Sequence, residues 1–298
     1  MGTPEFAVPS LEKLVAAGWN VVAVITAPDK PRGRGQKLVP SPVKVAAENL
    51  HIPVLQPKNL KSEEFLEELR SYNADLQIVV AFRMLPVVVW DMPKLGTFNL
   101  HASLLPDYRG AAPINWAIIN GEKETGVTTF FLKHEIDTGS ILFQEKTHIG
   151  EEENLGDLYE RLMEIGSNLV VKTVDAIASE KVNPLPQDES KAKNHAPKIF
   201  KETCEIDWTK SAEDIHNLVR GLSPFPAAFT QINGKNCKVY KTSFQTGSIQ
   251  SLTSGEWATD QKSYLKFQTA DGVLLIEELQ MEGKKRMKIG DFLRGNTL

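Results

Sequence analysis

The chain has 298 residues, which is long for one hydrophobic core and predicts two domains. Its 41% hydrophobic and 24% charged residues are typical of a globular protein, no apolar run reaches the ~18 residues of a membrane helix, and the N-terminus lacks a secretion signal. Because the formal net charge is −4, overall charge alone cannot account for nucleic-acid binding. The widely spaced Cys204 and Cys237 indicate neither disulfides nor a zinc site, which fits a reducing cytoplasm.

Apolar and amphipathic segments alternate through about the first 120 residues. We expect strands at residues 21–26, 52–55, 78–81, 97–102, 128–132 and 140–144, and helices at residues 9–17, 41–47, 111–120 and after Ser62. This alternation predicts an α/β fold with a mainly parallel, Rossmann-like sheet. No Gly-x-Gly-x-x-Gly follows a strand and no Walker A motif is present, which argues against a dinucleotide or ATP site.

Residues 28–40 interrupt the alternation with a long polar segment. Its prolines and glycines disfavour regular structure, so we expect an irregular loop. Charge alone favours a solvated loop, although a loop of this length within a compact domain is often functional. Its basic residues are Lys30, Arg32, Arg34 and Lys37.

The stretch from Thr97 to Gly110 has the polar pattern of a site. Side chains alternate between the faces of a strand, so Asn99 and His101 share one face, roughly 7 Å apart. Pro106 has no N–H and disfavours helix before it, so the chain bends out of the sheet there. A polar pair at the carboxyl edge of an α/β sheet lies where such folds bind ligands.

A second polar cluster, Asp137-Thr138-Gly139, also lies between apolar strands. A lone histidine near a strand end is most often structural. The spacing of His101 from Asn99, together with this second cluster, favours a catalytic site.

The second half of the chain has a different pattern of predicted helices and strands. The longest helix is expected at residues 154–180, and residues 181–198 hold the prolines and scattered charges of a linker. After an amphipathic helix at 211–222, about five short strands fit a small OB-like β-barrel. The clearest of these strands are residues 227–232, 235–242, 264–268 and 273–279.

The spacing Asn99-x-His101-x-Ser103-Leu104-Leu105-Pro106-x-x-Arg109-Gly110, followed by Asp137-Thr138-Gly139, resembles the signature of formyltransferases that use 10-formyltetrahydrofolate. Residues 2–7, 40–44 and 109–114 are similar to those of members whose acceptor is methionyl-tRNA, and the similarity extends over nearly the whole chain. Family members carry an apolar strand before the turn at Gly2, so this sequence begins later than theirs, by nature or by truncation.

The resemblance implies a catalytic domain over residues 1–180, a linker over 181–198 and an OB-like, tRNA-binding domain over 199–298. It implies a cytoplasmic enzyme of translation initiation that transfers the formyl group of 10-formyltetrahydrofolate, a co-substrate used without a metal, to the amino group of initiator methionyl-tRNA. We expect a monomer.

The resemblance also implies roles for individual residues. It assigns catalysis to Asn99, His101 and Asp137, and tetrahydrofolate binding to Ser103, Leu104, Leu105 and Pro106. It assigns contact with the tRNA acceptor end to Lys30, Arg32, Arg34 and Lys37 as a group.

Formyl transfer to an amine needs donors aimed at the oxyanion, a route for protons and exclusion of water. Asn99 offers amide donors, His101 can serve as oxyanion donor or as base, and Asp137 can orient His101. Arg109 is either a structural clamp on the loop or a contact to the substrate.

Other functions share parts of this pattern. A formyltransferase acting on a small-molecule amine such as a nucleotide sugar, or a hydrolase releasing formate, would use the same polar residues. A non-catalytic RNA-binding protein would not need those residues together. An NAD-dependent oxidoreductase would need the glycine fingerprint that is missing.

Overall fold

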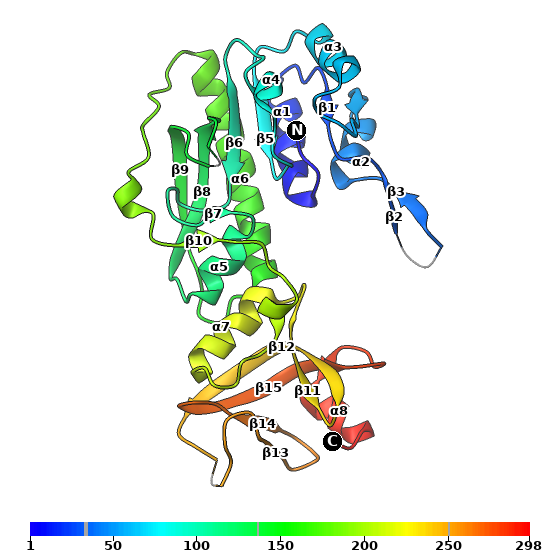
Figure 1. Ribbon diagram of the computed structural model, residues 1–298, viewed down its shortest axis with the longest axis vertical. Helices are drawn as coiled ribbons and strands as arrows, with labels where there is room; N and C mark the ends of the chain where they lie inside the picture. Colours follow the sequence, from blue (N-terminus) through cyan, green and yellow to red (C-terminus); the bar gives the residue numbers. More distant parts are fainter. Residues whose placement is uncertain (33–34, 136, 250) are drawn as a thin grey trace. The chain divides into compact units, whose positions relative to one another are not determined.

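The computed structural model describes residues 1–32, 35–135, 137–249 and 251–298 (Figure 1). These residues form two compact units. The first contains residues 1–109, 126–147 and 159–194, and the second contains residues 110–125, 148–158 and 195–298. The domain boundaries expected from the sequence stay a prediction.

The first unit contains parallel and antiparallel strand pairs. A four-stranded sheet has the order β5-β6-β8-β9, in which β6 pairs in parallel with β5 and antiparallel with β8. A separate parallel pair joins β1 to β4. The strands are β1 (Val24–Ile25), β4 (Val54–Leu55), β5 (Gln77–Val80), β6 (Thr97–His101), β8 (Glu124–Phe131) and β9 (Ile141–His148). The predicted Rossmann-like α/β fold is confirmed.

Helices alternate with these strands, as the apolar periodicity predicts. They are α1 (Val8–Ala16), α2 (Pro42–Asn49), α3 (Glu63–Ser71), α4 (Val87–Trp90), α5 (Pro113–Ile119) and α6 (Leu155–Ala178). Ser41 caps α2, because its Oγ accepts a hydrogen bond from the Lys44 N–H at 3.1 Å. Ser62 occupies the same position before α3, but its hydroxyl donates to the Asn59 carbonyl at 3.1 Å instead of capping the helix.

The first two residues connect the two sets of strands. The Gly2 N–H donates to the Ile25 carbonyl at 3.0 Å, and the Val80 N–H donates to the Met1 carbonyl at 2.9 Å. A side chain at Gly2 would place its Cβ 2.6 Å from the Ala7 Cβ, so only glycine fits this approach. Residues 1–2 therefore pair as a strand does, where the sequence predicts only a turn.

The basic segment is more regular than predicted. Strands β2 (Lys30–Arg32) and β3 (Lys37–Val39) pair as an antiparallel hairpin, so the expectation of an irregular loop is wrong over these residues. Both strands of a two-stranded ribbon are edges, which tolerate the missing N–H of Pro31. Leu38 is 69% exposed, so packing contributes little to holding the hairpin.

The second unit is a curled antiparallel half-barrel, in agreement with the predicted OB-like domain (Figure 1). Its six-stranded sheet has the order β11-β12-β15-β14-β13, with β16 paired to β15. Apolar side chains of α7, such as Ile215 and Val219, share one hydrophobic cluster with Val239 and Leu274 from the sheet. The elements are α7 (Ala212–Leu222), β11 (Ala228–Ile232), β12 (Lys235–Thr246), β13 (Trp257–Thr259), β14 (Leu265–Gln268), β15 (Gly272–Met281), β16 (Met287–Lys288) and α8 (Ile289–Gly295).

Short elements complete the chain. They are the 3-10 helices η1 (Glu5–Ala7), η2 (Glu189–Lys191) and η3 (Glu202–Cys204), and the two-residue strands β7 (Arg109–Gly110) and β10 (His195–Ala196). Within the part of the chain that the structure describes, no helix is both long and apolar enough to span a membrane.

Candidate active site

Strand β6 places Asn99 and His101 on one face of the sheet. Leu100, between them, points the other way and packs within 2.8 Å of the Cβ position of Gly166 on α6. Asn99 is half-buried, and His101 is 6% exposed. The amide and the imidazole therefore lie on the side of the sheet opposite to α6, as the strand alternation requires.

The hydrogen bonds of His101 fix its tautomer. Its Nε2 lies 2.9 Å from the carbonyl oxygen of Tyr108, and a carbonyl can only accept, so Nε2 carries the proton. Its Nδ1 faces the Asp137 carboxylate, with 3.9 Å between Nδ1 and Oδ2. This separation is too long for a direct hydrogen bond. In the neutral imidazole, Nδ1 therefore carries the basic lone pair.

The loop that contains the predicted folate-binding residues is held by hydrogen bonds to strand β8 and by one within the loop. Thr128 Oγ1 donates to the Ser103 carbonyl at 2.6 Å and accepts from the Leu105 N–H at 3.1 Å. The Ser103 hydroxyl donates to the Asp107 carbonyl at 2.7 Å. Of the four predicted residues, only Leu104 is partly exposed, while Ser103, Leu105 and Pro106 are buried. Their role in folate binding stays a prediction.

The segment after β5 belongs to the same edge of the sheet, and the sequence reasoning missed it. Val80 pairs in parallel with Leu100, so residues 81–85 leave the sheet beside the end of β6. Met84 is 73% exposed there, whereas Leu85 is buried. The signal was the position of this segment: it directly follows an apolar strand adjacent to the one that carries His101.

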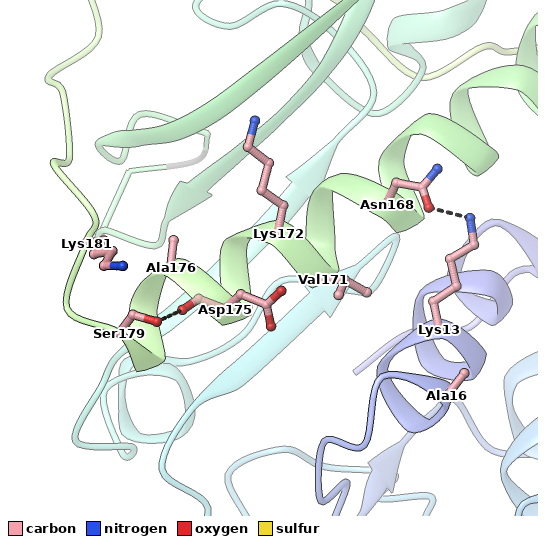
Figure 2. Close-up of a pocket in the computed structure, with 9 residues that line it drawn as sticks. All are labelled: Lys13, Ala16, Asn168, Val171, Lys172, Asp175, Ala176, Ser179 and Lys181. Carbon is pink, nitrogen blue, oxygen red and sulfur yellow. Dashed lines mark hydrogen bonds between the residues drawn. The ribbon is translucent and has the colours of Figure 1, made fainter.

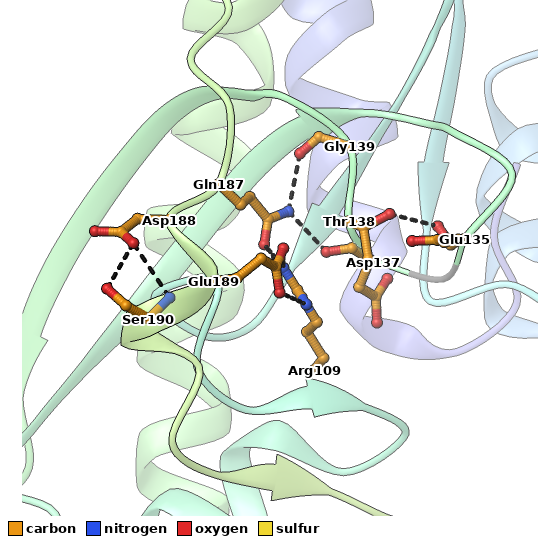
Figure 3. Close-up of polar contacts among 9 residues, drawn as sticks. All are labelled: Arg109, Glu135, Asp137, Thr138, Gly139, Gln187, Asp188, Glu189 and Ser190. Atoms are coloured by element: carbon orange, nitrogen blue, oxygen red, sulfur yellow. Dashed lines mark hydrogen bonds and ion pairs between the residues drawn. The ribbon is translucent and has the colours of Figure 1, made fainter.

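The Asp-Thr-Gly cluster is held by a residue from the predicted linker. Gln187 Nε2 donates to the Asp137 carbonyl at 2.7 Å and to the Gly139 carbonyl at 2.8 Å (Figure 3). Gln187 Oε1 in turn accepts from Arg109 Nε at 3.2 Å. The segment predicted as a linker therefore contributes hydrogen bonds to the backbone of the loop that carries Asp137.

Arg109 also forms a bidentate pair with Glu189. Its two terminal nitrogens lie 2.8 Å from the two carboxylate oxygens, which raises the pKa of Arg109 and lowers the pKa of Glu189 (Figure 3). Of the two interpretations of Arg109, these contacts favour a structural clamp. The clamp joins Gln187 and Glu189 to strand β7.

Three of the basic residues predicted to bind tRNA, Lys30, Arg32 and Lys37, lie on the β2–β3 hairpin, where Arg32 pairs in register with Lys37. Arg34, which belongs to the same predicted group, lies outside the described residues. The base of the hairpin is anchored, because the Asp29 carboxylate accepts from Lys44 Nζ and Gln56 Nε2, each at 2.7 Å.

An open groove of about 650 Å³ lies elsewhere on the first unit, between α1 and α6 (Figure 2). Lys13 from α1 and Lys172 from α6 are among its lining residues, and none of the predicted site residues is. Over the described ranges, no group of three or more His, Cys, Asp or Glu side chains is placed to hold a metal ion.

We expect Gly139→Ala to destabilise the first unit by about 3 kcal/mol, the upper range for overpacking. A Cβ at Gly139 would lie 1.5 Å from the Phe131 carbonyl oxygen, so the backbone beside Asp137 must move. Thermal unfolding followed by circular dichroism measures the effect. Gly290→Ala is the matched control, because nothing lies within 4 Å of its Cβ position. Equal melting temperatures for the two variants would contradict the close approach.

Two family models match the sequence. The model described as formyl transferase covers residues 1–174, and the model described as formyl transferase, C-terminal domain, covers residues 198–297. A protein of Bacteroides fragilis named methionyl-tRNA formyltransferase is 52% identical over 302 residues, covering 99% of this chain and 93% of its own length. One of the same name from Parabacteroides distasonis is 54% identical, covering 99% and 94%.

Solved structures share the fold at lower identity. WlaRD, a sugar 3N-formyl transferase crystallised in the presence of dTDP and 5-N-formyl-THF, has a TM-score of 0.69 and 23% identity, covering 95% of this chain and 97% of its own. An N-formyltransferase from Helicobacter canadensis in complex with folinic acid and dTDP-3-aminofucose has a TM-score of 0.67 and 22% identity, covering 94% and 97%.

Proposed function

This chain belongs to the formyl transferase family, and from that premise we propose how its residues move a formyl group from 10-formyltetrahydrofolate to the amino group of methionyl-tRNA. The chain is a formyl-transferring enzyme. Relatives named methionyl-tRNA formyltransferase share 52% and 54% of its residues over almost its full length, whereas the sugar formyltransferases share 22–23%. This difference favours the tRNA acceptor over a nucleotide-sugar amine.

The observation that carries the mechanism is the arrangement around His101. Its Nε2–H is committed to the Tyr108 carbonyl, and its Nδ1 faces Asp137 across 3.9 Å, on the same face as Asn99. A basic nitrogen, a carboxylate and an amide donor therefore share one edge of the sheet. These are the groups that acyl transfer to an amine requires.

His101 acts as the general base in this proposal. As the amino group of the methionyl ester forms a C–N bond to the formyl carbon, Nδ1 accepts a proton from the nitrogen. The resulting imidazolium is stabilised by Asp137, whose carboxylate oxygen is 3.9 Å away. His101 then returns the proton to N10 of the folate as the bond between N10 and the formyl carbon breaks.

Asn99 acts on the formyl oxygen. Negative charge accumulates on that oxygen when the amine attacks, and the amide N–H groups of Asn99 are donors of the right kind. The residue is half-buried, so it is reachable by a substrate while partly shielded from water. Donors in such surroundings stabilise charge more strongly than donors in bulk water.

The folate ring is placed against the edge formed by the loops after β5 and β6. Met84 and Leu104 offer exposed or partly exposed apolar surface there, which suits the faces of a flat pterin. Because the Ser103 hydroxyl already donates within its own loop, we assign Ser103 to shaping the pocket.

The tRNA is bound by local basic surface in this proposal, because the net charge of the chain is −4. The hairpin β2–β3 supplies Lys30, Arg32 and Lys37. We propose that the enzyme works as a monomer. We place it in the cytoplasm, where charged initiator tRNA is made and used.

The experiment is a comparison of acceptors. Purified protein is incubated with 10-formyltetrahydrofolate and either methionyl-tRNA or a dTDP-linked amino sugar, and formylation of each is followed by mass spectrometry. We expect formylmethionyl-tRNA only. Formylation of the sugar without formylation of the tRNA would overturn the proposal, and formate release without either product would indicate a hydrolase.

A further inference from the structure

We propose that the segment of residues 185–194, here called the strap, is a positioning element that holds the groups on both sides of the His101 ring, with Gln187 as its central residue. This inference rests on the proposed function of His101 and Asp137. It assigns Gln187 and Arg109 to the reaction as positioning residues, which act through Asp137 and not on the substrate.

Gln187 fixes the loop that carries Asp137. Its amide nitrogen donates to the carbonyl oxygens of Asp137 and Gly139, at 2.7 and 2.8 Å, so two peptide groups of the loop are held by one side chain (Figure 3). Asp137 has a φ of +57°, a left-handed conformation that is uncommon for residues other than glycine and that aspartate adopts more readily where its surroundings hold it. Two hydrogen bonds from one amide supply such surroundings.

Arg109 decides which way the Gln187 amide points. Its guanidinium group can only donate, so the Gln187 atom at 3.2 Å from Nε must be the oxygen, and the NH₂ group is left for the two carbonyls. Glu189 accepts from both terminal nitrogens of the guanidinium through its two carboxylate oxygens. Gln187 and Glu189 thus both bind Arg109, and this contact orients the NH₂ group of Gln187 toward the loop that carries Asp137.

The strap also supports the other side of His101. The Asp107 carboxylate accepts from the Lys193 and Asn194 N–H groups, at 3.1 and 2.6 Å. The Tyr108 N–H donates to the Asn194 carbonyl at 2.9 Å. The carbonyl of the same Tyr108 accepts from His101 Nε2. One segment therefore anchors both the acceptor at Nε2 and the carboxylate opposite Nδ1.

The start of the strap is fixed to the sheet. Leu185 and Ile141 exchange two backbone hydrogen bonds, at 2.8 and 2.9 Å, just after the Asp137 loop enters β9. The strap is therefore bound by backbone and side-chain contacts at both ends, and Gln187 lies between them. A loose linker would show no such series of contacts.

The test is Gln187→Glu in the full-length enzyme. The carboxylate keeps the shape and the pairing with Arg109, but it replaces a donor with an acceptor opposite two carbonyl oxygens. We expect kcat for formyl transfer to methionyl-tRNA to fall by about 10²-fold, as for other misplacements of a reacting group, with the KM for the tRNA changed less than about 2-fold. Lys181→Gln, which changes the net charge equally at an exposed position just before the strap, should leave kcat unchanged.

A double-mutant cycle with Asp137→Asn shows whether Gln187 acts through Asp137. In the Asp137→Asn background, Gln187→Glu should lower kcat by less than about 3-fold, because the Asp137 carboxylate is already absent and its position no longer affects the reaction. A full 10²-fold loss in both backgrounds, or unchanged kcat in the single variant, would overturn the inference. If the wild type itself forms no formylmethionyl-tRNA, the proposed function fails instead, which the same assay distinguishes.

A second variant covers the case in which Gln187→Glu unfolds. Gln187→Met removes the donors without adding charge, and circular dichroism reports whether the variant is folded. We expect the same loss of kcat and the same dependence on Asp137. A folded Gln187→Met enzyme with wild-type kcat would overturn the inference by itself.

Discussion

We expect His101→Ala to lower kcat for formyl transfer by about 10²–10⁴-fold, the usual contribution of a positioned general base. The reason is geometric: Nε2 is held by the Tyr108 carbonyl at 2.9 Å, which leaves Nδ1 as the basic nitrogen facing the Asp137 carboxylate. The affinity for 10-formyltetrahydrofolate should change little, because the imidazole acts on protons and not on the pterin. Steady-state kinetics measures kcat, and fluorescence titration measures folate binding.

The control for this prediction is His101→Gln. The amide of the introduced side chain can donate to the Tyr108 carbonyl, so the buried acceptor stays satisfied and the unfolding free energy should stay near that of the wild type. It offers no base, so kcat should be as low as in His101→Ala. Near-normal turnover in either variant would remove His101 from the mechanism.

We expect Asn99→Ala to lower kcat by about 10²–10³-fold, the usual cost of removing one oxyanion donor. Asn99 is half-buried on the same face of β6 as His101, so truncation removes a donor and adds no clash. The loss should appear in kcat and not in the dissociation constant of formyl-folate, because the donor acts on charge that develops only during attack. Steady-state kinetics and equilibrium binding, measured separately, check both parts.

Asn59→Ala is the matched control, because Asn59 is an exposed asparagine whose side chain accepts from the Lys61 N–H in a local turn. It should keep wild-type kcat. An Asn99→Ala enzyme that also kept it would show that the formyl oxygen is stabilised by another group, most directly by a protonated His101. Weakened folate binding with unchanged kcat would instead place Asn99 in the ground-state pocket.

Much of the fold could be predicted because it depends on local periodicity. The apolar stripe of α6 and the apolar run of β5 each identify an element from a few neighbouring residues, and the predicted ranges overlap those observed. The alternation along β6 likewise places Asn99 and His101 on one face without any knowledge of the rest of the chain.

Other features could not be predicted, because they depend on partners far apart in the sequence. Arg109 and Gln187 are 78 residues apart, so nothing near Arg109 indicated that its partner would come from a segment rich in prolines and charges. The basic hairpin was missed for a related reason. Pro31 argues against a strand in general, but an edge strand tolerates it.

The sequence by itself determined the kind of domains, the polar residues of the candidate site and the family signature that they form. Each of these depends only on residue type and short-range spacing. Only the tertiary structure decided which nitrogen of His101 carries the proton, what Arg109 binds, and that the strap reaches Asp137. Hydrogen bonds need atoms within about 3.5 Å of one another, and only the folded chain brings His101 that close to Tyr108, and Gln187 that close to Arg109 and to the Asp137 carbonyl.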